Sequence, residues 1–132
     1  MSHEDLIKHW FETANEDWET AEGLLTLDRR MAALFYTHIA LEKYLKGLIT
    51  KRDKDIKIPL NHNLLELSKM SGLELDADQL SHLTEINTFN IRARYDDFKR
   101  TFYNRATKEY TQEYFNYAKE FKIWLQNLYQ NK

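Results

Sequence analysis

The sequence contains no cysteine, and it has one proline and three glycines among its 132 residues. The absence of cysteine excludes a disulfide framework, a thiolate zinc site and a cysteine nucleophile. So few proline and glycine residues disfavour both a disordered chain and a turn-rich all-β domain. Hydrophobic residues make up 42% of the chain, which is sufficient for the core of a single helical domain.

Long apolar runs are also missing, because no stretch approaches the ~18 residues that a membrane helix requires. The first ten residues, MSHEDLIKHW, carry acidic side chains where a secretory signal would carry basic ones. We therefore expect a cytoplasmic protein with no membrane association.

Apolar residues recur every three or four positions over most of the chain, and this spacing predicts helices. Capping residues indicate where the helices start. The apolar residues between positions 91 and 106 show no clear helical period, so we expect a structured connection there. With about five helices and no strand pattern, we expect an all-α, antiparallel four-helix-type bundle in which residues 1 to 132 form one domain. The predicted helices run from Ser2 to about Thr26, Arg29 to Lys51, Asn63 to near Gly72, Asp76 to about Asn90, and Thr107 to Leu128.

The apolar positions also predict which helix faces form the core. Residues 29 to 51 carry two adjacent apolar stripes, and so wide a stripe indicates the central helix. The other two long helices carry one stripe each: Ile7, Trp10, Ala14, Trp18, Ala21 and Leu25 in the first, and Tyr110, Tyr114, Tyr117, Phe121, Trp124 and Leu128 in the last.

Charge is segregated along the chain although the net charge is only -2. Residues 29 to 57 hold eight basic and three acidic groups, and residues 92 to 132 hold nine basic and five acidic groups. If these segments are neighbours, they form a positive surface suited to phosphate groups. Acidic and basic helices that simply complement one another would explain the same pattern.

Two polar residues, His38 and Glu42, interrupt the apolar stripes of the predicted central helix. Glu42 has Lys46 one turn later, so it could form a structural ion pair, or it could contact a ligand directly. His38 and Glu42 could share a metal ion, but no third ligand follows at helical spacing. The sequence therefore predicts neither a metal nor another cofactor.

Cations and aromatic residues alternate between Arg92 and Arg105. Guanidinium groups bind phosphates and aromatic rings stack on bases, so this composition is typical of a nucleotide or single-stranded RNA contact. A loop whose rings anchor it to the core would have the same composition. Twelve of the 18 aromatic residues follow position 88, and this excess favours a homodimer interface.

The run from Ala33 to Leu48 is rich in alanine and leucine, and it ends in the sequence ALEKYLKGL. This run resembles the signature of the HEPN family, the higher eukaryotes and prokaryotes nucleotide-binding domain. That signature is an alanine-rich helix that ends in an A-x-E-K-x-L-K-x-L pattern. Further features fit the family in order along nearly the whole chain. The matching residues are the run from Ala33 to Leu48, the opening-helix positions Trp10, Ala14, Asp17 and Ala21, the segment from His62 to Leu67, and the pair Arg94-Tyr95.

The resemblance implies an antiparallel helical bundle, homodimerisation, and a function connected with nucleotides or RNA. Many members act with a nucleotidyltransferase partner in a toxin-antitoxin-like system. Others are ribonucleases with an R-x(4-6)-H motif, which is missing from this sequence. Binding is therefore favoured over catalysis, and a metal-independent ribonuclease or a purely structural interaction protein remain alternatives. The predicted binding contacts are Lys43, Lys46, Arg92, Arg94 and Tyr95, supported by His38, Glu42 and His62.

Overall fold

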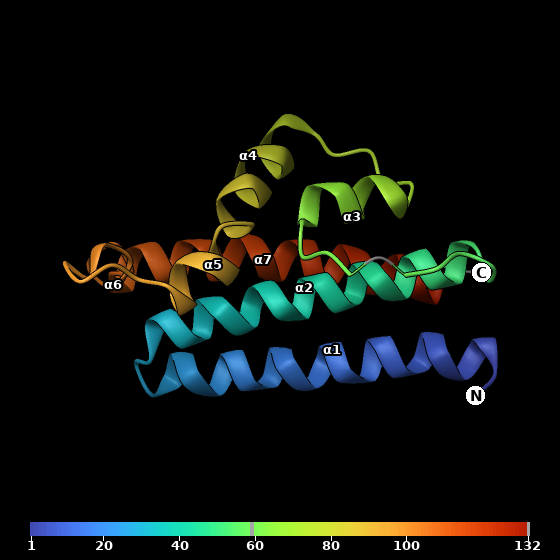
Figure 1. Ribbon diagram of the computed structural model, residues 1–132, viewed down its shortest axis with the longest axis horizontal. Coiled ribbons are helices and arrows are strands. Elements are labelled where there is room, and N and C mark those ends of the chain that lie inside the picture. Colours follow the sequence, from blue (N-terminus) through green and yellow to red (C-terminus); the bar gives the residue numbers. More distant parts are fainter. Residues whose placement is uncertain (59, 132) are drawn as a thin grey trace.

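Seven helices form the described part of the protein, residues 1 to 58 and 60 to 131 of the computed structural model. Three of them are long, and four short helices lie between the second and third long ones (Figure 1). The predicted all-helical fold is confirmed. The bounds are α1 His3–Thr26, α2 Arg30–Arg52, α3 Leu64–Met70, α4 Ala77–Ile86, α5 Phe89–Arg94, α6 Thr101–Arg105 and α7 Lys108–Gln130.

The helix starts follow the capping residues that the sequence predicted. Ser2 and Asp5 form a reciprocal capping box at the start of α1, and Asp76 and Gln79 form another at α4. The Asn63 side chain accepts hydrogen bonds from two backbone amides of the first turn of α3. These side chains accept hydrogen bonds from first-turn amides that have no partner within the helix. The caps therefore fix the starts of α1, α3 and α4 at the predicted residues.

Two details of the predicted elements differ from the structure. The helix expected to reach Asn90 ends at Ile86, and α5 begins three residues later. The predicted connection from 91 to 106 contains most of α5 and all of α6, which raises the number of helices above the expected five. Such short helices give too few turns for an apolar period to be recognised in the sequence.

The central position of α2 is confirmed, because it packs against α1 on one side and against α7 and the short helices on others (Figure 1). The α1 helix runs antiparallel to α2, whereas α7 runs in the same direction as α2. Side-chain contacts support this arrangement: Arg30 at the start of α2 binds Ala106, just before α7, and Lys51 near the end of α2 binds the last carbonyls of α7. The short helices take the fourth position of the bundle.

Gly47 allows α1 and α2 to approach closely. A β-carbon at this position would lie 2.5 Å from a ring atom of Phe11 and 3.1 Å from the β-carbon of Trp10. Since real side chains do not come this close, the absence of a side chain at Gly47 permits the packing of the two helices.

The buried face of α7 is displaced by about one residue from the predicted one. Its buried residues are Thr111, Phe115, Ala118, Phe121 and Leu125. The predicted tyrosines at 110, 114 and 117 instead flank this line and are half-buried against the core. A tyrosine on the flank buries its ring while its hydroxyl group stays near water.

Candidate functional site

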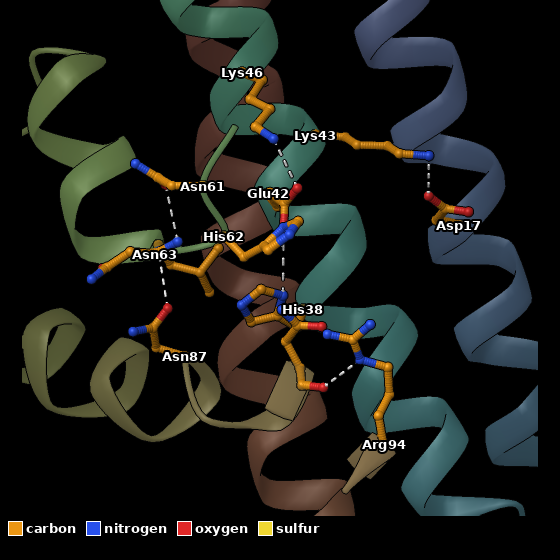
Figure 2. Close-up of polar contacts among 12 residues, drawn as sticks. Asp17, His38, Glu42, Lys43, Lys46, Asn61, His62, Asn63, Asn87 and Arg94 are labelled. Carbon is orange, nitrogen blue, oxygen red and sulfur yellow. Dashed lines mark hydrogen bonds and ion pairs between the residues drawn. The ribbon is translucent and has the colours of Figure 1, made fainter. Parts of the chain in front are cut away.

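The signature residues of α2 lie on one side of the helix, where the loop before α3 crosses it. Figure 2 shows His38, Glu42 and Lys46 along this side, with His62 pointing toward Glu42 from the loop. Their spacing of four residues places them one above another on a helix. We refer to His38, Glu42, Lys46 and His62 as the Glu42 cluster.

Glu42 is the centre of this cluster. Its two carboxylate oxygens accept separate partners, Lys46 Nζ at 2.9 Å and His62 Nδ1 at 2.8 Å. Glu42 and Lys46 are each only 6% exposed. A buried carboxylate needs such partners because it has lost its hydration shell. Of the two roles open for Glu42, the geometry supports the structural one, in which its charge joins the loop at His62 to α2.

His38 lies below Glu42 and is fully buried, with its Nδ1 atom 3.9 Å from the Glu42 carboxylate. Burial lowers the pKa of His38 to about 4, and Glu42, the His62 backbone and Asn87 oppose that shift only in part. The ring is therefore neutral at pH 7. Neither ring nitrogen has a hydrogen-bond partner within the described chain.

Asparagines hold the loop and α3 in place around the cluster. Asn87, which follows α4, accepts a hydrogen bond from the Leu64 amide at 2.8 Å, and Asn61 donates to Glu66 at 3.2 Å. Leu64 and Leu67 are fully buried beside them. The His62-x-Leu64-x-x-Leu67 element thus combines one hydrogen bond to Glu42 with two buried leucine side chains. Sequence reasoning missed Asn87, since no local pattern connects it with Leu64.

Lys43 does not join the Glu42 cluster. Its side chain extends to the opposite side of α2 and forms an ion pair with Asp17 of α1 at 2.7 Å (Figure 2). Lys43 and Lys46 are three residues apart, so helical spacing alone allowed them to share a face. Asp17 attracts one of them to α1, and the two lysines bind different carboxylates.

Arg92 is held by structural contacts rather than left free for a ligand. Its guanidinium group donates to Thr88 at 3.1 Å, lies 3.6 Å from the Glu85 carboxylate and covers the Phe102 ring. Glu85 also binds Arg105 at 2.8 Å and accepts a hydrogen bond from Tyr110. Glu85 therefore joins α4 to α5, α6 and α7, which the sequence did not predict.

Arg94 and Tyr95 remain exposed at the end of α5. Arg94 donates through Nε to the Asn90 carbonyl at 3.1 Å, and its guanidinium carbon lies 5.8 Å from the Phe35 ring and 5.2 Å from the Tyr95 ring. No ion pair engages Arg94 in the described residues. The remaining guanidinium donors can therefore bind an anion.

The described residues contain no group of three or more His, Asp or Glu side chains that could hold a metal ion. They also contain no helix long and apolar enough to cross a membrane. In the same residues, neither His38 nor His62 forms a hydrogen bond with Arg92 or Arg94.

The fold and its buried polar cluster define a small helical-bundle domain. A family model described as "HEPN domain" matches residues 7–128. The chain therefore belongs to the HEPN domain family, as the resemblance of its central helix indicated.

Two solved structures share this fold. TT1696 from Thermus thermophilus has a TM-score of 0.75, and ST0689, described as an archaeal HEPN homologue, has a TM-score of 0.73. Each is 21% identical to this chain, and each comparison covers 92% of this chain and 96% of the other. At this identity the likeness shows the fold alone. No curated protein matches the sequence significantly.

Proposed function

We propose that the protein is a binding module for nucleotides or single-stranded RNA, and that Arg94 and Tyr95 form its main contacts. The supporting observation is that the Arg94 guanidinium carbon lies 5.8 Å from the centroid of the Phe35 ring and 5.2 Å from that of the Tyr95 ring, while Arg94 forms no ion pair within the described residues. Tyr95 is 70% exposed. A guanidinium group beside an accessible ring can bind a phosphate and stack on the adjacent base.

The other predicted contacts have a supporting role in this proposal. Glu42, Lys46 and His62 fix the loop that packs on α2, and Lys43 fixes α1. Arg92 orients α5, which carries Arg94. His38 is fully buried, so a polymer cannot reach it without local unfolding.

The same segment carries exposed apolar residues, which supports association with another protein surface. Ile91 and Phe98 are 55% and 93% exposed. Exposed rings and aliphatic side chains of this kind are typical of interfaces. Together with the family resemblance, they support a homodimer that works beside a nucleotidyltransferase in a toxin-antitoxin-like pair. Sedimentation of Phe98→Ser beside the wild type tests the dimer, and a wild type that sediments as a monomer would contradict it.

Fluorescence anisotropy with a labelled single-stranded RNA tests the binding proposal. Arg94→Gln should weaken binding and reduce the log-log salt slope by roughly 0.7, the value for one single-strand phosphate contact. Tyr95→Ala should cost about 1-3 kcal/mol of binding free energy without changing the slope, because stacking releases no counterions. Tyr95→Phe keeps the ring and should bind almost as the wild type does.

Lys119→Gln is the matched control, since it removes one exposed cation from α7, away from α5. It should change neither the affinity nor the slope appreciably. If the wild type binds no RNA or nucleotide, or if Arg94→Gln and Tyr95→Ala bind like the wild type, the proposed contacts are wrong. RNA cleavage in the presence of a chelator would point to the ribonuclease alternative instead.

A further inference from the structure

A second basic region lies at the end of the bundle where α1 turns into α2. There α6 and the first turn of α2 border a cavity of about 310 Å³. Figure 1 shows the α1–α2 turn and α6 at the same end of the molecule. The charged lining consists of Arg29, Arg30, Arg100 and Asp28, and the ring of Tyr103 forms part of the wall. We refer to this cavity as the arginine pocket.

Two contacts fix the position of Arg30 in this pocket. Its Nε atom donates to the Ala106 carbonyl at 2.5 Å, and its Nη1 atom lies 2.7 Å from the Asp28 carboxylate. Asp28 is therefore neutralised inside the pocket itself. The two other arginines contribute positive charge that no lining carboxylate balances.

Arg100 is also held in a defined place. Its guanidinium carbon lies 3.6 Å from the centroid of the Tyr103 ring, so the two groups are in close contact. In the described residues, neither Arg29 nor Arg100 forms an ion pair. Stacking restricts the motion of a long side chain while its N–H donors remain available. The pocket thus holds two arginines without an anionic partner and a third that is paired with Asp28.

The first turn of α2 adds to the positive potential. Arg29 is the N-cap of this helix, and no side chain of the described residues caps the turn. Met31 and Ala32 of the same turn line the pocket. The positive end of the helix dipole therefore lies at the same cavity as the arginines. This contribution is secondary to the three guanidinium groups.

We propose that the arginine pocket binds the phosphate group of a phosphorylated ligand. Guanidinium groups match the geometry of phosphate oxygens, and each can donate two parallel hydrogen bonds. The volume exceeds that of a single phosphate group, so the rest of the ligand can extend past Tyr103. The ligand is a free phosphate compound or the phosphorylated end of an RNA chain. Binding here is independent of the proposed RNA contacts at Arg94 and Tyr95.

Isothermal titration with inorganic pyrophosphate tests the pocket directly. Arg29→Gln and Arg100→Asn should each weaken binding roughly tenfold to a hundredfold, the effect of losing a hydrogen bond to a charged group. Asparagine is chosen at position 100 because Arg100 has a φ of 57°, a conformation that asparagine tolerates. Arg30 is left unchanged because it supports Ala106.

The matched control is Lys108→Gln. Lys108 lines the adjacent cavity, in which Glu109 and Glu113 are also present, and it does not line the arginine pocket. The substitution removes one positive charge nearby, so it should change pyrophosphate binding by no more than about twofold, since screening weakens a charge outside the site. Unfolding curves of the three variants confirm that each is folded at the titration temperature.

Anisotropy with one RNA oligonucleotide, carrying either a 5′-phosphate or a 5′-hydroxyl, identifies the source of the phosphate. A preference for the 5′-phosphate that disappears in Arg29→Gln and Arg100→Asn supports an RNA end. Arginine-dependent binding of pyrophosphate without that preference supports a free phosphate compound. The proposal is overturned if the wild type does not bind pyrophosphate, or if the two arginine variants bind it no more weakly than Lys108→Gln does.

The outcomes for the two regions are separable. If 5′-hydroxyl RNA binds in an Arg94-dependent manner and pyrophosphate does not bind, the pocket proposal fails and the RNA-binding proposal stands. If pyrophosphate binds through Arg29 and Arg100 and no RNA binds, the pocket proposal stands and the RNA-binding proposal fails.

Discussion

Replacing Glu42 by glutamine tests the structural role of the Glu42 cluster. The substitution removes the negative charge but keeps the size of the side chain, so Lys46 is left buried with an unbalanced ammonium group. Removing one partner of a buried ion pair typically costs about 3–5 kcal/mol. Glutamine still offers one oxygen acceptor, so we expect a loss of about 3 kcal/mol in the free energy of unfolding.

Urea unfolding followed by far-UV circular dichroism measures this loss. With an m value of about 1–3 kcal/mol per molar urea, the midpoint should fall by roughly 1–3 M. The double variant with Lys46→Met should lose less than Glu42→Gln alone, because it leaves no buried cation without a partner. Hydrogen exchange should become faster in residues 61 to 67, which His62 ties to Glu42.

Glu12→Gln provides a matched control for Glu42→Gln. Glu12 also pairs with a lysine four residues away, Lys8 at 3.6 Å, but both side chains are more than 60% exposed. An exposed pair of this kind contributes about 0–1 kcal/mol. If Glu42→Gln is as mild as Glu12→Gln, or if Glu42→Gln and Lys46→Met have additive effects, the cluster does not act as a coupled buried unit.

Two further predictions concern His38 and Gly47. Because burial lowers the pKa of His38 to about 4, the unfolded chain binds a proton at this residue between pH 6.5 and 4 and the folded chain does not. The free energy of unfolding should therefore fall by up to about 3 kcal/mol as the pH drops through this range. His38→Leu should flatten this pH profile. An unchanged profile in His38→Leu would contradict the lowered pKa of the buried His38. Gly47→Ala should destabilise the protein by about 1–3 kcal/mol in thermal unfolding because its β-carbon meets Phe11, whereas Gly23→Ala, which meets no atom within 4 Å, should be neutral or stabilising.

The roles of the site residues could be predicted from the sequence only in part. The anomaly of Glu42 inside an apolar stripe indicated a buried carboxylate, and Lys46 was a predicted partner. His62 was predicted only as a supporting binding residue, and its contact with Glu42 was not foreseen. The structure does not bring the four predicted cations Lys43, Lys46, Arg92 and Arg94 into one group. Lys43 pairs with Asp17, and Arg92 lies against Glu85. Each lysine or arginine has several possible carboxylate partners in the sequence, and only the folded structure shows which carboxylate lies close enough to pair with it.

The sequence by itself determined the three long helices and the starts of α3 and α4. Apolar spacing and the capping residues Ser2, Asn63 and Asp76 act within a few positions of one another, so their effect does not depend on the path of the chain. The central place of α2 also followed from its own composition. The missing cysteines excluded disulfides and thiolate metal sites without reference to any fold.

Only the tertiary structure decided which residues from distant segments meet. Helical spacing identifies the buried face of a helix only to within about one residue. The packing of α7 against the rest of the bundle determines which residues of α7 are buried. His62 reaches Glu42 across 20 positions, and Arg100 joins Arg29 and Arg30 in one pocket only because the chain returns to the start of α2 after α5. Such contacts depend on the route of the connections, which no local pattern encodes.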